Sequence, residues 1–380
     1  MSTSQLPGSV DSRTRLPVEW YRRMQEEDPV HYDAQRGIWD VFRYEDATRV
    51  LTDETTFSAD IVSADTPRPV TDDDLSLIKS AMIRVDGDVH DQRRDFATTS
   101  FSPRGVDTLQ PRIKEIADDL LTSLAGRDRV ELLEEFSTQL PRAVTAELFD
   151  IPQEDREKFK ELDIVNFTQV SSPDQEFLQI HQMVSEYFSE LIAERADGEG
   201  DDLITLAATQ EALSQEEKIG FCLALLIAGM ATTNNLIAGA IRLFVNNNLI
   251  NALQAGRIDR EKAIEEVLRY RSPVQSATRR VTRPVELGGK QIKEGQPITV
   301  WIGAANRDPE VFTAPDEFRP ERTPNPHMAF GRGEHFCLGS SLARLEGNVA
   351  IQTLLDRFDR IAPEESDTLP RHVLPQMIFS

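Results

Sequence analysis

The sequence predicts a mainly α-helical protein with a small β-rich part. Apolar residues recur at helical spacing over much of the central chain, in the stretches 109–124, 132–149, 153–169 and 175–195. A further stretch, 214–246, is long enough and apolar enough for one central helix. Strand-like patterns are confined to two short regions, near 28–43 and near 274–302. Helices therefore dominate the predicted fold.

The N-terminal elements are predicted in a simple order. Residues 20–27 have a helical pattern, and the runs 30–32 and 38–42 predict a hairpin closed by a glycine-containing turn. A short helix is expected over 44–51. Residues 53–80 contain prolines and an acidic run but no clear period, which predicts a long loop. Long loops in compact proteins are usually functional.

The long helix is predicted to begin with a capping box, in which Ser214 is followed three residues later by Glu217. A helix from there to about residue 246 spans roughly 50 Å. Residues 219–241 carry no charge, so a transmembrane span is an alternative. A polar cluster at 232–235 and several glycines argue against it. We expect a buried central helix with a site along one side.

Composition narrows the function classes. The excess of 65 acidic over 42 basic residues gives a net charge of -23, which argues against a nucleic-acid or anionic-membrane binder. Lysine is scarce, as in proteins that stay hydrated at high salt, although an acidic mesophilic protein fits as well. The first 20 residues lack an apolar stretch, which predicts neither a signal peptide nor a membrane anchor. Two cysteines exclude a Cys-rich zinc site and fit a reducing cytosol, so we expect a cytoplasmic protein.

Cys337 is the strongest candidate for chemistry. Glycines at 331, 333 and 339 bracket it, and glycine lets backbone N–H groups approach a sulfur closely. The pattern after Gly339 is helical, so Cys337 precedes a helix N-terminus, whose positive end favours a thiolate. A buried structural cysteine in a glycine turn is the ordinary alternative. Cys222, in an apolar helical run, is expected to be a core residue.

The stretch around Cys337 resembles the haem-binding loop of the cytochrome P450 family. Its motif reads Phe330-Gly331-x-Gly333-x-x-x-Cys337-x-Gly339. The resemblance implies one cytochrome P450 domain over residues 1–380, with haem b between the long helix and the Cys337 loop helix. It implies Cys337 as the axial thiolate ligand of the iron, Phe330 beside the thiolate and His335 at a haem propionate. Gly331 and Gly339 belong to the same implied cofactor-binding loop.

The resemblance implies further contacts to haem. His90 and Arg94 lie four residues apart on one helix face and match the family's His-x-x-x-Arg helix, which holds the propionates. Arg279 aligns with the family's third propionate-binding base, with the adjacent Arg280 as the alternative. The loop over 53–82 corresponds to the segment that caps the family's substrate pocket.

The long helix contains the sequence Ala228-Gly229-Met230-Ala231-Thr232-Thr233, which resembles the family's oxygen-binding motif. By this resemblance Gly229, next to Ala228, lets the helix open over the iron, and Thr232 helps to protonate bound dioxygen. Ala231 replaces the acidic residue that commonly precedes the threonine, so one of the two usual proton-delivering groups is missing. Plain helix packing is the alternative explanation of this stretch.

Glu266 and Arg269 share a helix face, and a pair of this spacing is by itself usually a surface contact. In the family such a pair joins an arginine from a Pro-Asp-x-Phe-x-x-x-Arg segment, here Arg322. The resemblance implies a buried network that holds the proximal side of the site in place. Strands are expected between the two motifs, over 274–281, 285–287 and 298–302.

The implied activity is hydroxylation or a related oxidation of a small apolar organic molecule with O₂ and two electrons. A ferredoxin-type redox partner with its reductase would supply the electrons, docking on a basic face formed by Arg93, Arg104, Arg112 and Arg344. Three alternatives remain. They are a peroxide-driven peroxygenase, motivated by Ala231, a non-redox haem enzyme that rearranges or dehydrates an oxygenated substrate, and a haem gas sensor.

Overall fold

The computed structural model describes residues 17–61, 82–98, 100–127, 129–156, 175–362 and 377–379. The chain divides into two compact units, each built from stretches that are distant in sequence. The first unit contains residues 1–65, 235–337 and 351–380, and the second contains residues 66–234 and 338–350. Among the described helices, α11 (Gln215–Asn246) and α15 (Ser340–Arg357) contribute residues to both units.

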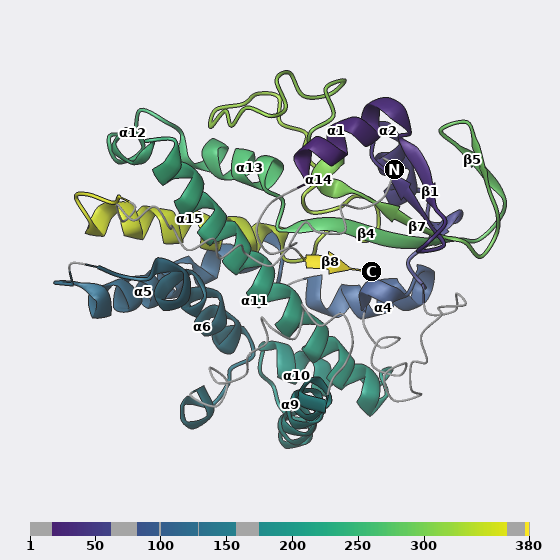
Figure 1. Cartoon of the computed structure of the whole chain (residues 1–380). Coiled ribbons are helices and arrows are strands. Elements are labelled where there is room, and N and C mark those ends of the chain that lie inside the picture. The colour runs from purple at the N-terminus through teal and green to yellow at the C-terminus, as the bar shows by residue number, and fades with distance from the viewer. Residues whose placement is uncertain are drawn as a thin grey trace. The chain divides into compact units, whose positions relative to one another are not determined.

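Within the described residues, a six-stranded sheet organises the first unit (Figure 1). In spatial order its strands are β1 (Val30–Asp33), β2 (Ile38–Val41), β7 (Pro297–Val300), β4 (Val274–Val281) and β3 (Phe57–Ser58), with β8 (Met377–Phe379) paired to β4. β1 and β2 form the predicted antiparallel hairpin, while β7 pairs parallel with β2 and antiparallel with β4. A separate hairpin joins β5 (Val285–Leu287) to β6 (Lys290–Ile292) through the glycine pair at 288–289.

Branched apolar side chains fix the register of this sheet. Val41 on β2 is the partner of Val30 on β1 and of Val300 on β7, and all three are fully buried. Burying each such side chain contributes roughly 1.5–3 kcal/mol. A one-residue slip would turn them to the opposite face, so the register is strongly specified.

Aromatic packing holds α1 (Val18–Glu27) in the first unit. The ring of Trp20 lies 4.9 Å from that of Phe42 and 5.1 Å from that of Trp301, in edge-to-face arrangements that aromatic pairs favour. The remaining helices of this unit include α2 (Tyr44–Thr52), α12 (Ile250–Gln254) and α13 (Arg260–Tyr270). The helices predicted over 20–27 and 44–51 are confirmed by α1 and α2.

The strand predicted over 298–302 ends early, because Ile302 begins the short helix α14 (Ile302–Ala305). The chain changes from strand to helix at Trp301. Its N–H donates to the Val41 carbonyl (2.9 Å), which continues the strand pairing, and its own carbonyl accepts the N–H groups of residues 304–305. The prediction was wrong at Ile302 because the apolar pattern continues while the hydrogen bonding changes to that of a helix.

Helices make up the described part of the second unit. They include α4 (Gly87–Thr98), α5 (Pro103–Leu124), α6 (Gln139–Leu148), α9 (Gln175–Glu194) and α10 (Leu203–Ala208), with 3₁₀ turns at Met82–Arg84 and Gln153–Asp155. α10 was not predicted, and it begins where Asp202 Oδ1 accepts the N–H groups of Ile204 and Thr205, each at 3.0 Å. Residues 157–169 of a predicted helix, and residues 62–81 of the predicted loop, lie outside the described residues.

The helix predicted over 132–149 is divided into a π-helical turn, Leu133–Ser137, and α6. The Ser137 hydroxyl lies 3.0 Å from the Leu133 carbonyl oxygen and 2.9 Å from Asn234 Oδ1. A serine that bonds back to the preceding turn disturbs the regular helical ladder. Apolar spacing does not report such a bond, so the sequence predicted one continuous helix.

The predicted capping box at the start of α11 is confirmed. The N–H of Ser214 donates to Glu217 Oε2 (2.8 Å), and the N–H of Glu217 donates to Ser214 Oγ (3.2 Å). Among the described helices, α11 alone is long and apolar enough to cross a membrane, and 67% of its most apolar window is buried. That burial is what a core helix shows.

Candidate functional site

The loop that carries Cys337 is closed by its own backbone. The N–H of Cys337 donates to the carbonyl of Phe330 (2.9 Å), and the N–H of Phe336 donates to that of Gly333 (3.0 Å). Cys337 is exposed at the end of this loop, and its sulfur forms no disulfide. The local backbone therefore holds a thiol at a fixed position on the surface of the first unit.

Gly333 and Arg332 fix the loop against α2. Gly333 has a φ of +73°, and a Cβ there would lie 2.5 Å from the carbonyl oxygen of Leu51, so this close approach requires glycine. The guanidinium carbon of Arg332 lies 5.1 Å above the Tyr44 ring, and the group donates to the Tyr44 hydroxyl and to the Pro326 carbonyl (3.1 Å). The sequence assigned Arg332 no role, yet it anchors the loop.

The segment just before the loop is also anchored. The N–H of the fully buried Met328 donates to Asn306 Oδ1 (2.8 Å). His327 Nε2 lies 3.0 Å from Glu265 Oε2 on α13. Because these contacts join positions about 20 and 60 residues apart in the sequence, no local motif could have indicated them.

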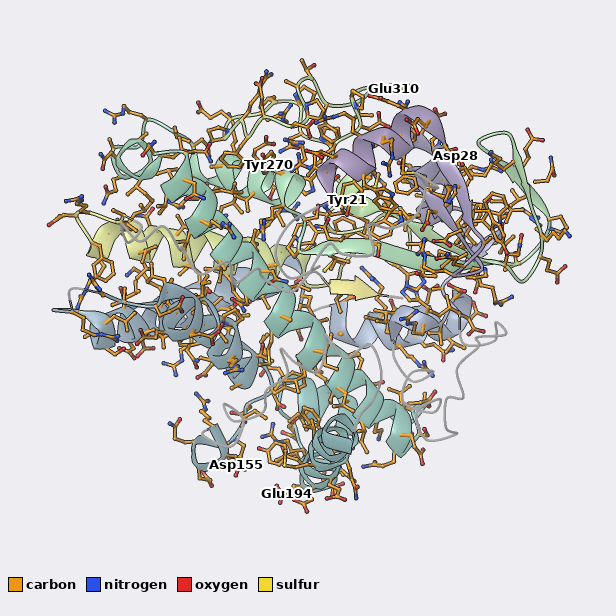
Figure 2. All side chains as sticks on the ribbon, viewed as in Figure 1. Tyr21, Asp28, Asp155, Glu194, Tyr270 and Glu310 are labelled. Carbon is orange, nitrogen blue, oxygen red and sulfur yellow. The ribbon has the colours of Figure 1, made fainter. Side chains whose placement is uncertain are left out.

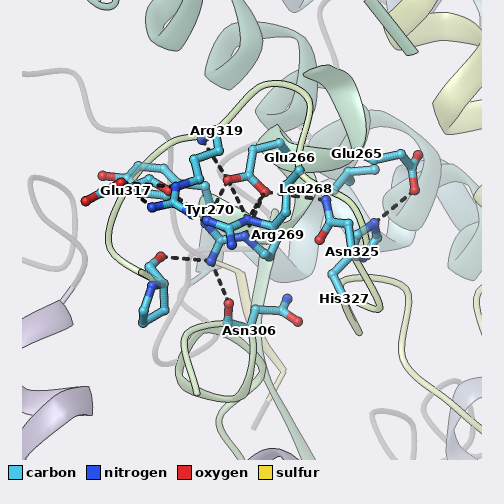
Figure 3. A network of polar contacts seen from close by, with 12 residues as sticks. Glu265, Glu266, Leu268, Arg269, Tyr270, Asn306, Glu317, Arg319, Asn325 and His327 are labelled. Carbon is cyan, nitrogen blue, oxygen red and sulfur yellow. Dashed lines mark hydrogen bonds and ion pairs between the residues drawn. The ribbon is translucent and has the colours of Figure 1, made fainter. Parts of the chain in front are cut away.

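The predicted network of Glu266, Arg269 and Arg322 is confirmed, and Figure 3 shows Glu266 and Arg269 at its centre. Arg269 binds both carboxylate oxygens of Glu266, at 2.7 and 2.8 Å, and both residues are fully buried. Nε of Arg322 lies 3.1 and 3.0 Å from the same two oxygens. The backbone N–H of Arg319 adds a further bond of 2.9 Å to Oε1. Every oxygen of this buried carboxylate is therefore held by charge-assisted bonds.

Asn306 connects this network to the Cys337 loop. Arg269 Nη1 donates to the Asn306 carbonyl (2.8 Å), while the Asn306 side chain donates to Ser272 Oγ (2.8 Å) and accepts the N–H of Met328. A chain of hydrogen bonds thus runs from α13 to the residues that lead into the loop. Asn306 was not predicted, because an isolated asparagine after a short helix has no characteristic spacing.

Arg279 and Arg280 occupy successive positions on β4 and so point to opposite faces of the strand. Arg280 Nε donates to the carbonyl of Asp60 (2.9 Å). Arg279 is buried, with Nη1 bonded to the carbonyl of Thr278 (2.9 Å). Because Arg280 is already hydrogen-bonded to Asp60, Arg279 is the better candidate for binding a cofactor carboxylate. That role stays a prediction.

In the second unit, α4 carries His90 and Arg94 one turn apart. His90 is buried, and its Nδ1 lies 3.2 Å from Asp91 Oδ1. Arg93, between them, is buried and pairs with Glu217, the acidic member of the α11 capping box. This ion pair ties α4 to the start of α11 and so fixes the helix that presents His90 and Arg94.

The predicted basic docking face is wrong in one of its four members, Arg93. Arg93 is buried in its pair with Glu217 and cannot face a partner. Arg112 donates to Glu115 Oε2 (2.6 Å) and Glu147 Oε1 (2.7 Å), so its charge is offset by neighbouring carboxylates. Sequence spacing shows where arginines lie along a helix but not which of them find acidic partners in the fold.

The motif on α11 combines a polar hydroxyl, that of Thr232, with an exposed position, Ala228. Thr232 Oγ1 donates to the Ala228 carbonyl at 2.6 Å. Ala228 is exposed, whereas Met230 and Ala231, two and three residues later, are each 2% exposed. A Cβ on Gly229 would lie 3.5 Å from the hydroxyl of the buried Thr145 on α6. One face of this helix is therefore accessible, and Ala231 is not on that face.

The donor set fits a haem with one thiolate ligand. Burial, followed by the charge of Asp202, raises the pKa of the Cys222 thiol, so that sulfur stays protonated. Cys337, exposed in its closed loop, is then the remaining candidate for the soft anionic donor that a haem iron requires, and that role stays a prediction. Basic side chains suited to two carboxylates are present on α4 and β4.

The predicted site residues divide between the two units. Phe330, Gly331, His335, Cys337 and Arg279 belong to the first unit, and the first four share one loop. The second unit contains His90, Arg94, Ala228, Gly229, Thr232 and Gly339. The roles of both groups toward a cofactor stay predictions.

Comparison with known proteins gives a consistent result. A family profile described as cytochrome P450 matches residues 261–379. The chain is 34% identical to cytochrome P450 109 of Bacillus spizizenii, over 90% of this chain and 84% of that protein. It is 32% identical to the erythromycin C-12 hydroxylase of Saccharopolyspora erythraea, over 97% of this chain and 93% of that protein.

A solved structure shares the fold. The crystal structure of CYP109E1 from Bacillus megaterium in complex with testosterone superposes with a TM-score of 0.82 at 33% identity, covering 92% of each chain. Similarity at this identity and coverage extends over both compact units rather than over one motif.

Proposed function

The chain belongs to the cytochrome P450 family, and on this premise we propose that Cys337 is the axial thiolate of its haem and that its substrate is a small apolar organic molecule. As a member of that family it is a haem-binding monooxygenase. Haem b, when bound, supplies the oxidising chemistry that inserts an oxygen atom from O₂ into the substrate. The observation that carries the ligand assignment is the closed glycine loop with its exposed thiol.

The chain's basic residues hold the cofactor in this proposal. His90, Arg94, Arg279 and His335 would donate to the two haem propionates, and Phe330 would cover the thiolate side. Replacing Arg94 by Gln removes a charge but keeps a donor, so we expect weaker haem retention with the thiolate signature unchanged. Haem transfer to an excess of apomyoglobin measures this retention.

Thr232 is proposed to hold the proton that oxygen activation consumes. A hydroxyl that donates to the Ala228 carbonyl keeps its lone pairs available to accept from a water molecule, and rotation about χ1 then redirects the proton. Since Ala231 offers no carboxylate, water would supply Thr232 directly. Thr232→Ala should therefore lower product per electron consumed while leaving haem and substrate binding nearly unchanged.

A ferredoxin-type partner with its reductase is proposed as the electron source. Arg104 on α5 is exposed and Arg344 on α15 is partly exposed, so these two members of the predicted docking face are accessible to a partner. Complementary charge mainly sets the association rate. Arg104→Glu with Arg344→Glu should slow reduction at low salt, and an unchanged rate in this double variant would exclude that face.

One experiment separates the candidate activities. The holoenzyme is supplied with ferredoxin, reductase and NADPH, or with hydrogen peroxide alone, and product is measured for a substrate found by its effect on the haem spectrum. We expect turnover only with the electron supply. Turnover only with peroxide would identify a peroxygenase, the alternative motivated by Ala231. No turnover with either, but tight CO or NO binding, would identify a gas sensor.

We also propose that residues 1–380 form one cytoplasmic domain. The two compact units share two helices, α11 and α15, whose continuity supports a single cooperative fold. Thermal unfolding of the holoprotein, followed by far-UV circular dichroism and by haem absorbance, should then give one transition at the same temperature with both probes. Two separate transitions would contradict the proposal.

A further inference from the structure

Arg271 lies at the C-terminal end of α13, with its stem along α11. It is the C-cap residue of α13, and its Cδ lies 3.5 Å from the position that a Cβ on Gly239 would take. Val267 Cγ1 lies 3.7 Å from the same position. Because Gly239 has no side chain, the surface of α11 at this point is occupied by the Arg271 side chain.

Two further arginines surround the same place. Arg242 is exposed and lies three residues beyond Gly239, on the same face of α11. Arg307 Nη2 donates to the carbonyl of Tyr270 (2.7 Å), the residue before Arg271, and the Arg307 guanidinium carbon lies 4.2 Å above the Tyr270 ring. Tyr270 marks the position in Figure 2. Arg242 and Arg307 therefore both lie near the Arg271 side chain at the end of α13.

The charges at this place do not balance. Arg307 pairs with Asp316 (2.9 Å), but Asp316 also binds Arg22. Within the part of the chain that the structure describes, no ion pair joins Arg271 or Arg242 to a carboxylate. Burial, and then the charges of Arg242 and Arg307, lower the pKa of Arg271 to about 10. This arrangement is unusual in a chain whose net charge is -23.

The C-terminal end of a helix favours a cation, but it does not account for all three. The helix end is equivalent to roughly half a negative charge, and its effect is confined to the last turn. It can offset part of the charge of Arg271 alone. Among the described residues, no carboxylate pairs with Arg242, and Arg307 shares Asp316 with Arg22, so positive charge at this place is left without an acidic partner.

We propose that Arg271 and Arg242, supported by Arg307, bind a small dianionic oxyanion of the phosphate class. A guanidinium presents paired N–H donors that match the oxygens of phosphate. Two such groups, one partly buried and one exposed, can bind two edges of one dianion, which would also neutralise their mutual repulsion. The site lies within the first unit and does not depend on the assignments made for Cys337 or Thr232.

Thermal unfolding of the holoprotein tests the site. Inorganic phosphate is titrated at constant ionic strength, maintained with NaCl, because a bound ligand stabilises by mass action. We expect the wild-type Tm to rise saturably, by about 1–3 °C at ten times the dissociation constant. Arg271→Gln and Arg242→Gln should each abolish the saturable rise, and without phosphate Arg271→Gln should melt no lower than wild type, since repulsion is relieved.

Arg357→Gln is the matched control, because it removes one positive charge from the exposed last turn of α15. It should keep the full response to phosphate. Sodium acetate, a monoanion, should give no saturable rise. The proposal is overturned if wild type does not respond, if acetate gives the same response, or if the Arg271 and Arg242 variants respond as the control does. If Arg271→Gln does not fold, calorimetry measures phosphate binding to Arg242→Gln instead. Lost binding supports the proposal, and binding equal to that of wild type overturns it.

Discussion

Glu266 and Glu346 are two buried glutamates with opposite surroundings. Glu266, in the first unit, is fully buried and receives bonds from Arg269, Arg322 and the N–H of Arg319. Glu346, on α15 in the second unit, is 3% exposed, and among the described residues its Oε2 has no hydrogen-bond partner. Burial alone raises the pKa of Glu346 to about 8.

The difference shows that burial does not determine what a carboxylate does. A buried charge is costly unless donors satisfy it, and Glu266 has donors at both oxygens. It can remain a charged fixed point that holds the loop before Cys337. Glu346 lacks such donors and instead takes up a proton, so we expect the first glutamate to govern structure and the second to govern how stability depends on pH.

The largest expected effect comes from breaking the Glu266 network. Arg269→Ala leaves the Glu266 charge buried with fewer donors and releases the Asn306 carbonyl, at a cost of about 3–5 kcal/mol. We expect little folded holoprotein, measured as haem content per chain after purification.

Arg319→Ala is the control for that experiment. Among the described residues its side chain binds only the exposed Glu317, and its contribution to Glu266 is a backbone N–H that alanine keeps. Haem content near that of wild type in Arg319→Ala, with loss in Arg269→Ala, supports the comparison. An equal loss of haem content in both variants would show that any substitution near this network disturbs the fold, and that the ion pair of Arg269 with Glu266 has no special role.

Glu346→Gln should remove a pH dependence. The folded protein keeps a proton that the unfolded carboxyl releases above about pH 4.3. The stabilisation is therefore complete below that pH and is lost as pH rises through about 8. From pH 6 to pH 8 the free energy of unfolding of wild type should fall by about 2 kcal/mol relative to Glu346→Gln. Denaturant unfolding at both pH values measures this, and a constant difference would mean that Glu346 does not titrate in this range.

A carboxylate introduced at Ala231 would be a third buried acid to set beside Glu266 and Glu346, because Ala231 is 2% exposed. Ala231→Asp places an acid beside Thr232 in a site as buried as that of Glu346, so the acid should hold a proton. If proton delivery limits the reaction, product per electron should rise several-fold in Ala231→Asp and fall in Thr232→Ala. Substrate titration provides the control: lost affinity would show a steric effect, and unchanged affinity with unchanged coupling would contradict the proton argument.

The smallest effect is expected at an exposed pair. Arg112 donates to Glu115 and Glu147, but its side chain is 43% exposed, so solvent screens the attraction. Arg112→Ala should change the free energy of unfolding by no more than about 1 kcal/mol. Urea unfolding measures this change. If Arg112→Ala lost as much free energy of unfolding as Arg269→Ala, burial would not determine how much an ion pair contributes to the stability of this protein.

Local patterns predicted much of the secondary structure. Helical spacing predicted α1, α2 and α9, and the capping box located the start of α11 within one residue. They failed where one hydrogen bond changes the element, as at Ser137 and Trp301, because a side-chain or backbone bond of this kind leaves no trace in apolar spacing.

The candidate site was predictable where a motif is contiguous. The Cys337 loop and the network at Glu266 were identified from short spacings. Asn306 and the pair of His327 with Glu265 were missed because their partners lie far away in the sequence. The burial of Arg93 was missed for the same reason, since its partner Glu217 is 124 residues away. Long-range contacts of single polar residues are decided by packing and not by local pattern.

We propose that Cys337 supplies the axial thiolate, and the absorption spectrum of the reduced protein with CO reports which ligand the haem iron has. Wild type and Cys222→Ala should both show the long-wavelength band diagnostic of thiolate ligation, because the Cys222 thiol is buried and protonated. Cys337→Ala should lose that band while still forming a CO complex at shorter wavelength. A long-wavelength band that persists in Cys337→Ala would contradict the account.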